Sequence, residues 1–343
     1  MMYYFALLGL ALSIFCTLAV RRVAGKVDVL DRPDVERKFH DRPVPLLGGV
    51  ALFIAWWVSV GYLVFAQPVY GIEIIKDKLF AAFIASLIIL VVGVADDIRG
   101  VAPRWRFLAI ALCALIAVTF GIGLDKITNP FGGVVPLSTL FGNALVFVWL
   151  IGIMFTTKIS DGLDGLSTGV VLIGSLMIFF LSRAGKFYQP NVALLSLMFA
   201  AVCLGFLIFN FHSASIFLGE SGSLFIGFIL GVLAIISGSK LAITFLVIFV
   251  PALDIARVVY ERWRAHEPLF RGDRRHLHYR LRDIGLSERA VVLVFYFLAA
   301  VFGSLGLLLP SGQKLVVIII AVLGIAAVSV RLPKINRSYE KNK

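Results

Sequence analysis

The sequence predicts an all-α, polytopic integral membrane protein with about eleven transmembrane helices in one domain, residues 1–343. Of the 343 residues, 60% are hydrophobic and only 15% are charged, whereas soluble domains are about half apolar and about a quarter charged. The mean hydropathy is +0.98. Because each membrane-spanning helix needs about 20 apolar residues, this composition excludes a soluble two-domain protein, a disordered chain and a disulfide scaffold.

Eleven apolar runs define the expected helices. Such continuous apolar sequence lacks the alternation of a membrane-barrel strand, and a backbone in hydrocarbon must satisfy its own hydrogen bonds. The three cysteines all lie inside these runs, so they predict packing and neither a disulfide nor a metal site. We expect helices, in order, at 3–20, 49–68, 79–95, 106–123, 139–157, 166–182, 192–209, 223–237, 241–259, 290–309 and 315–330.

Charge in the connections predicts the orientation. Alternate connections, with the C-terminal tail and two helix-end arginines, hold 25 of the 32 Lys and Arg residues, and the other side holds 7. Because basic loops stay in the cytoplasm, we predict a cytoplasmic C-terminus and an N-terminus outside. Of the 20 acidic residues, 17 fall on the cytoplasmic side, whereas a transporter keeps key ionisable groups near the bilayer midplane. The active site is therefore expected in the inner loops 21–48, 96–105, 158–165, 210–222 and 260–289.

Paired carboxylates close the third run. Asp96 and Asp97 are adjacent, and two adjacent carboxylates at a membrane edge repel each other unless they share a cation. The alternative is a solvated helix end that only marks the interface. The pair alone leaves a metal site and an interfacial marker equally open.

A second acidic motif lies between the fifth and sixth runs. Asp161 and Asp164 are each followed by glycine. Glycine lets the backbone approach a ligand closely, so both carboxylates can face one centre. An ordinary turn between two spans explains only one Asp-Gly pair, and the second pair favours a functional loop.

The segment that precedes the eighth run is rich in glycine and serine. Backbone N–H groups at such a helix start form an anion site. Alternatively, Ser221 or Ser223 acts as the N-cap, and Glu220 simply suits the positive end of the helix dipole. Taken alone, this segment favours the cap.

The largest inner loop is polybasic, with five arginines in twelve residues. Arginine binds phosphate in bidentate geometry, so Arg274 and Arg275 together with His276 and His278 suit a diphosphate. Attraction to anionic lipids is the alternative for the outer arginines. Zinc is not expected at this motif, because a His-x-His pair offers too few ligands.

All these motifs fall on the predicted cytoplasmic face. The chain has no Walker-type or dinucleotide-binding glycine motif, and its positive charge lies beside a membrane, so no nucleic-acid partner is expected. An acidic metal centre, an anion-binding helix start and a basic rim suit the transfer of a phosphorylated group. The donor would be cytoplasmic and the acceptor would lie in the membrane.

At these residues the chain resembles the polyprenyl-phosphate N-acetylhexosamine-1-phosphate transferases, glycosyltransferase family 4. Within that superfamily it looks like the bacterial undecaprenyl-phosphate GlcNAc-1-phosphate transferases, which start O-antigen, enterobacterial common antigen and teichoic acid linkage synthesis. It is less similar to the phospho-MurNAc-pentapeptide translocases. The matching segments follow the family's order: Asp31 to Gly49, Gly93 to Arg106, Asp161 to Leu166, Phe206 to Gly227 and Asp273 to Leu281.

The resemblance implies an enzyme that transfers HexNAc-1-phosphate from a UDP-N-acetylhexosamine to undecaprenyl phosphate and releases UMP. It implies Mg²⁺ as the cofactor, with Mn²⁺ as the second option. It also implies a bacterial plasma-membrane location, contact with membrane lipids and a cytoplasmic active site, and leaves a homodimer open. The implied catalytic residues are Asp96, Asp97, Asp161 and Asp164, and the implied metal ligands are Asp96, Asp97 and Glu220.

Substrate-binding roles follow from the same resemblance. It implies that Phe217 stacks on uracil and that His276 and His278 lie at the donor's diphosphate and sugar. We also expect substrate contacts from Lys158, Asn210, Arg274 and Arg275.

The sequence departs from the family pattern near this site. Phe155 and Lys158 stand where the family usually has Asn, Glu220 replaces Asp, Ser215 replaces a Lys or Arg, and Tyr279 replaces a third His. We expect Glu220 still to bind Mg²⁺, and Lys158 to pair with a carboxylate or the donor's phosphates. A helix-end cation among the lipid headgroups is the alternative for Lys158. An inactive scaffold, a lipid transporter and a pentapeptide translocase remain alternatives for the whole chain.

Overall fold

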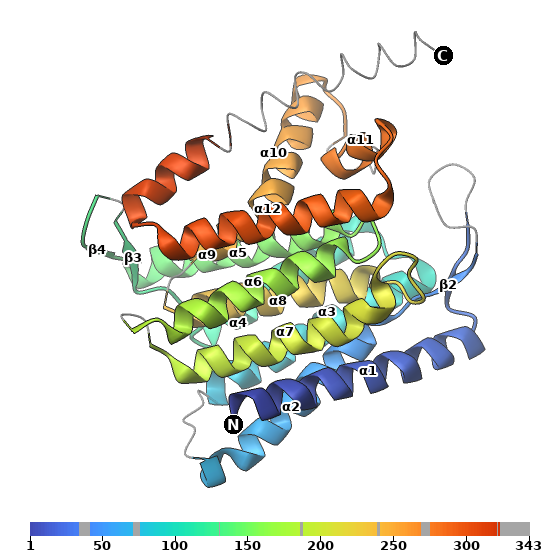
Figure 1. The fold of residues 1–343 in the computed structure, drawn as a ribbon, viewed down its shortest axis with the longest axis horizontal. Coiled ribbons are helices and arrows are strands. Elements are labelled where there is room, and N and C mark those ends of the chain that lie inside the picture. The colour runs from blue at the N-terminus through green and yellow to red at the C-terminus, as the bar shows by residue number, and fades with distance from the viewer. Residues whose placement is uncertain are drawn as a thin grey trace.

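The computed structural model describes residues 1–33, 42–70, 76–129, 131–185, 188–238, 241–268, 275–320 and 322. These residues form a helical bundle with two short hairpins (Figure 1). The helices are α1 Met2–Lys26, α2 Gly48–Tyr70, α3 Lys76–Arg99, α4 Pro103–Thr119, α5 Thr139–Ser160, α6 Leu166–Arg183, α7 Pro190–Asn210, α8 Gly219–Ile236, α9 Leu241–Val247, α10 Phe249–Arg264, α11 Leu277–Asp283 and α12 Glu288–Leu308. The strands are β1 Leu30–Asp31, β2 Val44–Pro45, β3 Lys126–Thr128 and β4 Val134–Pro136.

The predicted class of polytopic all-α membrane protein is confirmed. Among the described residues, 8 helices are long and apolar enough to cross a membrane, or up to 9 if the bent pair α9–α10 is one span. The α4 helix overlaps the fourth predicted run but ends at Thr119, four residues before that run does, and has only 17 residues. The last run is described as helix only over Ser311–Ile320. Eleven spans and their orientation therefore stay predictions.

The ninth apolar run, 241–259, is not the single straight helix that its hydropathy predicts. It forms α9 and α10, which meet at an angle of 74°. Pro251 lies in the first turn of α10. A proline ring clashes with the carbonyl four residues earlier and removes a backbone donor, and that earlier residue is Val247, where α9 ends. Proline thus explains the break.

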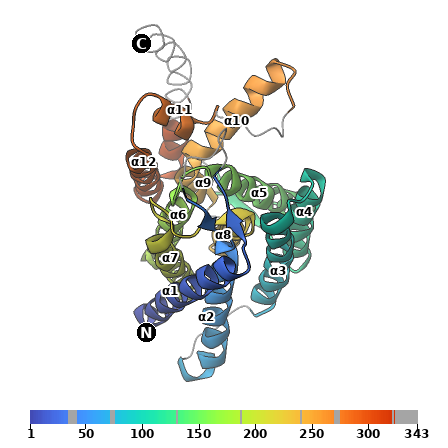
Figure 2. The ribbon, with the colours of Figure 1, turned by 90° about the vertical axis from the view of Figure 1, so that its right-hand side faces the viewer.

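The α8 helix lies at the centre of the bundle (Figure 2). It packs against α2, α3, α5 and α6, and every residue from Ser221 to Ile235 is buried. A helix that is apolar on all sides is expected to be enclosed. The enclosure requires small residues on the neighbouring helices: a Cβ atom added to Gly93 of α3 would lie 2.4 Å from the Cα atom of Ser221.

The two hairpins lie at opposite ends of the bundle (Figure 1). The antiparallel β1–β2 pair joins α1 to α2, with Leu30 opposite Pro45. It is tied to the segment before α8, because Phe217 donates its N–H to Pro45 and accepts from the N–H of Gly48. This end of the bundle, where α3 and α5 finish and α8 begins, carries the candidate site.

Candidate active site

A polar cavity of about 910 Å³ opens at this end of the bundle. Its walls come from the β1–β2 hairpin, from the ends of α3, α5 and α7, and from the starts of α8, α11 and α12. All five inner loops predicted from the sequence contribute to it. The polar side chains that line it are Asp31, Arg42, Asp96, Asp97, Lys158, Asp161, Asp164, Asn210, His212, Ser213, Ser215, Glu220, Ser223, Tyr279 and Glu288.

Asp97 accepts three hydrogen bonds from the first turn of α8. The backbone N–H groups of Glu220 and Ser221 donate over 2.7 and 3.3 Å, and the Ser221 hydroxyl donates over 2.6 Å. Gly219 makes this approach feasible, since its φ is +75° and an added Cβ would lie 2.7 Å from an Asp97 oxygen. A protein carboxylate therefore fills the anion site that the sequence predicts at this helix start.

The predicted serine N-cap of α8 is wrong. Leu218 occupies the N-cap position, and its side chain accepts no capping bond. Ser221 donates to Asp97, while Ser223 donates to the carbonyl of Glu220. The capping carboxylate comes from α3, so local sequence around α8 gave no signal for it.

Asp96 has different partners from its neighbour. It accepts from the N–H of Val101 over 2.6 Å and from the Arg106 guanidinium over 3.2 Å. Both groups belong to the start of α4 or the turn before it. The two adjacent carboxylates are thus held by α4 and by α8, respectively, and each has a compensating donor.

Lys158 points into the site and pairs with Glu220. The Arg106 guanidinium also lies 3.9 Å from Glu220. The predicted pairing of Lys158 with a carboxylate is confirmed, and the alternative position among the lipid headgroups is wrong. Together with Asp96, these groups form a chain of two cations and two anions on one wall of the cavity.

The carboxyl group of Asp161 has no hydrogen bond or ion pair among the described residues, although it lies among the acidic groups Asp97, Glu220 and Asp164. Burial raises the pKa of its carboxyl well above the usual range, and the charges of Asp97, Glu220 and Asp164 raise it further. Four carboxyl groups thus lie near one another, and a bound cation would favour their ionised forms. Such a cluster of carboxylate oxygens fits a hard divalent cation.

Asn210 and Phe217 shape the loop that follows α7. The buried amide of Asn210 accepts from the Thr168 hydroxyl and donates to the carbonyl of Ile216, both over 3.1 Å. Phe217 lines the cavity and is held by its backbone bonds to the β1–β2 hairpin. The substrate contacts expected of both residues stay predictions.

The histidine motif is held by Asp254 of α10. That carboxylate lies 2.9 Å from Nδ1 of His276 and 2.7 Å from the Arg257 guanidinium. His278 is buried beside Gly162, where an added Cβ would lie 2.5 Å from its Nε2 atom. Burial and neighbouring His276 lower the pKa of His278 to about 3, so it is neutral at pH 7.

Of the two arginines that precede His276, the structure describes only Arg275. Arg275 pairs with Glu267 over 2.7 Å, and Arg274 lies outside the described residues. Neither observation tests the expected contact with a diphosphate.

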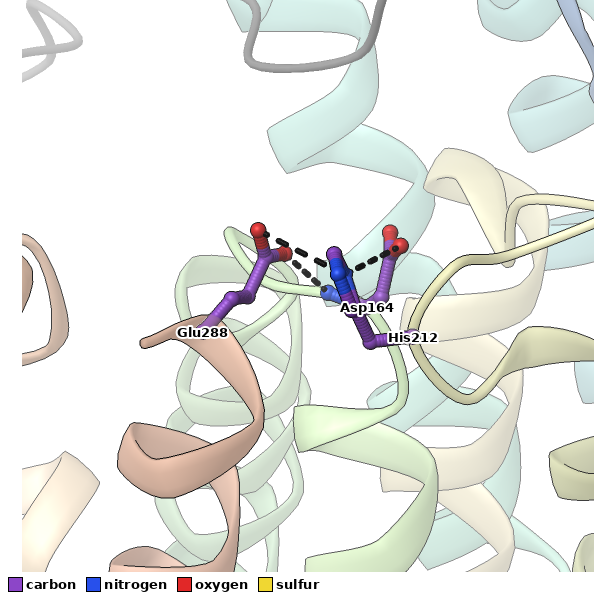
Figure 3. A group of neighbouring side chains, drawn as sticks. All are labelled: Asp164, His212 and Glu288. Carbon is purple, nitrogen blue, oxygen red and sulfur yellow. Dashed lines mark hydrogen bonds and ion pairs between the residues drawn. The ribbon is translucent and has the colours of Figure 1, made fainter. Parts of the chain in front are cut away.

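Two residues that the sequence does not single out also line the cavity. His212 follows α7 and Glu288 begins α12, and both lie against Asp164 (Figure 3). The Nδ1 atom of His212 is 3.5 Å from Asp164 and 3.6 Å from Glu288. Whole helices separate Asp164, His212 and Glu288 in the sequence, so the three residues form no motif that could be recognised there.

Comparison with known proteins gives a consistent result. The family described as "Glycosyl transferase family 4" matches residues 79–238. The "Probable undecaprenyl-phosphate N-acetylglucosaminyl 1-phosphate transferase" of Bacillus subtilis (strain 168) is 31% identical over 89% of this chain and 84% of its own length. The "Decaprenyl-phosphate N-acetylglucosaminephosphotransferase" of Mycolicibacterium smegmatis is 32% identical over 97% of this chain and 89% of its own length.

A third relative aligns over a similar share of the chain. The "Undecaprenyl-phosphate alpha-N-acetylglucosaminyl 1-phosphate transferase" of Thermotoga maritima is 30% identical over 86% of this chain and 87% of its own length. All three similarities extend over at least 86% of the chain. The chain therefore belongs to glycosyl transferase family 4.

Proposed function

We propose that this protein transfers GlcNAc-1-phosphate from UDP-GlcNAc to undecaprenyl phosphate and releases UMP, on the cytoplasmic side of a bacterial plasma membrane. The names of three relatives that align over most of the chain support the reaction. The observation that carries it is the charged cavity at the helix ends, where carboxylates and cations from five connections surround about 910 Å³. A lipid phosphate at the membrane surface and a nucleotide from water can meet there.

The donor set of the cavity fits Mg²⁺. Asp161 has no protein cation of its own among the described residues, and it faces Asp97 and Glu220. These three carboxylates would hold Mg²⁺, with Mn²⁺ as the alternative ion, since both prefer oxygen ligands. Asp96, proposed from the sequence as a further ligand, is held by Arg106 and Val101. When bound, the ion would supply positive charge that stabilises the donor's phosphates as UMP departs.

The protein's own residues would position the reactants. An oxygen of the lipid phosphate attacks the phosphorus atom that bears the sugar, and the bond from that phosphorus to the UMP oxygen breaks. A phosphate monoester has a second pKa of about 6, so roughly nine-tenths is already dianionic at pH 7. Proton removal would therefore contribute only about 0.1 kcal/mol. We assign Asp97 and Asp161 to positioning and metal binding, and Lys158 and Arg106 to charge stabilisation.

The test uses the purified full-length chain with undecaprenyl phosphate and radiolabelled UDP-GlcNAc, UDP-GalNAc or UDP-MurNAc-pentapeptide. We expect equal amounts of UMP and labelled lipid product from UDP-GlcNAc. Product from the pentapeptide donor alone would reassign the protein to the translocase type. Lipid binding without UMP release from any donor would favour a scaffold or transporter and overturn the proposal.

A further inference from the structure

Asp164, His212 and Glu288 converge on one point in the cavity wall (Figure 3). Asp164 lies in the connection before α6, His212 follows α7, and Glu288 opens α12. One ligand atom from each lies within 4.8 Å of the other two. Three separate elements thus bring an imidazole nitrogen and two carboxylate oxygens together, away from the pairs that Lys158 and Arg106 make.

Two of the separations between these atoms match those of ligands that share an ion. Nδ1 of His212 lies 3.5 Å from Oδ2 of Asp164 and 3.6 Å from Oε2 of Glu288. A direct N–H···O hydrogen bond brings its heavy atoms to about 2.7–3.2 Å, which is shorter. Two ligands each about 2.0–2.1 Å from a tetrahedral ion are about 3.3 Å apart. The triad is therefore too open for direct bonds and is close to metal-ligand spacing.

The Nδ1 atom of His212 supplies an independent indication. It is buried and makes no hydrogen bond within the part of the chain that the structure describes. If Nδ1 of a neutral imidazole carries the lone pair, that lone pair faces two carboxylates, which is unfavourable unless a cation lies between them. The tautomer with a proton on Nδ1 would instead face both carboxylates at distances longer than a normal hydrogen bond. The rival arrangement is a protonated imidazole that pairs with both carboxylates at long range.

Neighbouring groups orient the two carboxylates. Oδ2 of Asp164 accepts from the N–H of Ala214 over 2.9 Å, and Oε1 of Glu288 accepts from the N–H of Asp164 over 3.3 Å. Such outer contacts fix ligands in metal sites. The guanidinium of Arg282 lies 3.6 Å from Oε2 of Glu288. With a neutral histidine, two carboxylates and one arginine leave one negative charge for a cation to balance.

We propose that Asp164, His212 and Glu288 bind one divalent transition-metal ion of the Zn²⁺ type, distinct from the Mg²⁺ of the proposed reaction. The imidazole ligand favours Zn²⁺, whereas Mg²⁺ prefers an all-oxygen set. The ion links the connection before α6 to the start of α12. It therefore holds one wall of the cavity together, and the assignment does not depend on which sugar the enzyme transfers.

The test measures Zn²⁺ binding to the full chain, purified through a streptavidin-binding tag because a polyhistidine tag would itself bind zinc. The protein is stripped with a chelator, and Zn²⁺ is titrated calorimetrically in millimolar Mg²⁺. We expect one Zn²⁺ per chain. His212→Ala and the nearly isosteric Glu288→Gln each weaken binding at least about 100-fold, the upper range seen when only an outer contact of a metal site is lost.

The matched control is His266→Ala, which removes an exposed histidine from the turn after α10 and leaves Zn²⁺ binding unchanged. Zn²⁺ should also raise the Tm of the wild type but not of Glu288→Gln, because only an ion bound to the folded state stabilises it. No stoichiometric binding by the wild type would overturn the site and favour the protonated imidazole. Binding that survives both substitutions would also overturn it and move the ion to His276 and His278.

Discussion

The adjacent carboxylates Asp96 and Asp97 have different hydrogen-bond partners at this site. Asp97 caps the central helix through three donors, whereas Asp96 is held by the start of α4. Because each carboxylate is compensated separately, the repulsion expected of a shared pair is relieved without a common cation. The role of each aspartate must therefore be tested individually.

Replacing Asp97 by Asn should remove most turnover and leave the protein folded. The amide keeps an oxygen that can accept from the N–H groups of α8, but it lacks the charge. We expect kcat for UMP release to fall at least about 10²-fold, the scale of losing one preorganised electrostatic group. Asp28→Asn is the control, since Asp28 is exposed and pairs only with Arg32 among the described residues. Near-normal kinetics for the Asp97 variant would reduce Asp97 to an interfacial helix cap.

Glu220 can be separated from its partner Lys158 by charge-matched variants. If Glu220 binds Mg²⁺, Glu220→Gln should shift the Mg²⁺ dependence of UMP release to concentrations at least about tenfold higher. Glu220→Asp keeps the charge and should shift it less. The double variant Lys158→Gln with Glu220→Gln restores charge balance and should retain the shift. Wild-type Mg²⁺ curves for all three would leave Glu220 with only its ion pair.

At the scale of elements, glycines determine how closely α3 and α8 approach. Gly93 faces the first turn of α8, and the same contact brings Asp97 to its hydrogen-bond donors. In a membrane, where lipid is as apolar as leucine, such small residues permit backbone contact between helices. Site geometry and helix packing thus depend on the same position.

Gly93→Ala should therefore destabilise the protein. The new methyl group would overlap the Ser221 backbone at 2.4 Å, and overpacking of this kind costs about 1–3 kcal/mol. Thermal unfolding in detergent should show a lower Tm. The control is Gly61→Ala in α2, where an added Cβ meets nothing within 4 Å, and its Tm should stay constant or rise. Equal Tm values for both variants would contradict the close packing.

At the scale of the whole molecule, hydropathy and charge predict most of the architecture. The apolar runs coincide with helices among the described residues, because hydrocarbon leaves the backbone no other partner, although the fourth helix ends early at Thr119 and the ninth run is broken into two helices. The last run is described only in part. Predicting the bend at Val247 requires the effect of Pro251 on the helix as well as hydropathy. Acidic motifs also located Asp97 and Asp161, but not their surroundings.

Those surroundings escape sequence analysis for a physical reason. Asp97 caps a helix that begins more than a hundred residues later, and His212 and Glu288 carry no motif of their own. Tertiary packing alone sets such contacts. A single sequence gives the residue types that can do the chemistry, whereas the donors that fix each carboxylate come from helices remote along the chain.

The orientation of the chain across the membrane can be tested by labelling introduced cysteines. The 25 to 7 split of basic residues predicts that a cysteine at Ser338, in the tail beyond the described residues, is shielded in intact cells. A cysteine at the exposed Thr128 of the β3–β4 hairpin should react with an impermeant maleimide. The native cysteines are buried and should give little background. The reverse labelling pattern would place the cavity outside.

The central position of α8 has a consequence for biogenesis. Synthesis proceeds from the N-terminus, so α2, α3, α5, α6 and α7, all of which contact α8, leave the ribosome before it does. When α8 enters the bilayer, most of the surfaces that enclose it are already present, with α9 the later exception, and so is Asp97 to neutralise its first turn. The segment that is most enclosed in the finished protein therefore inserts among completed neighbours and need not remain long in lipid alone.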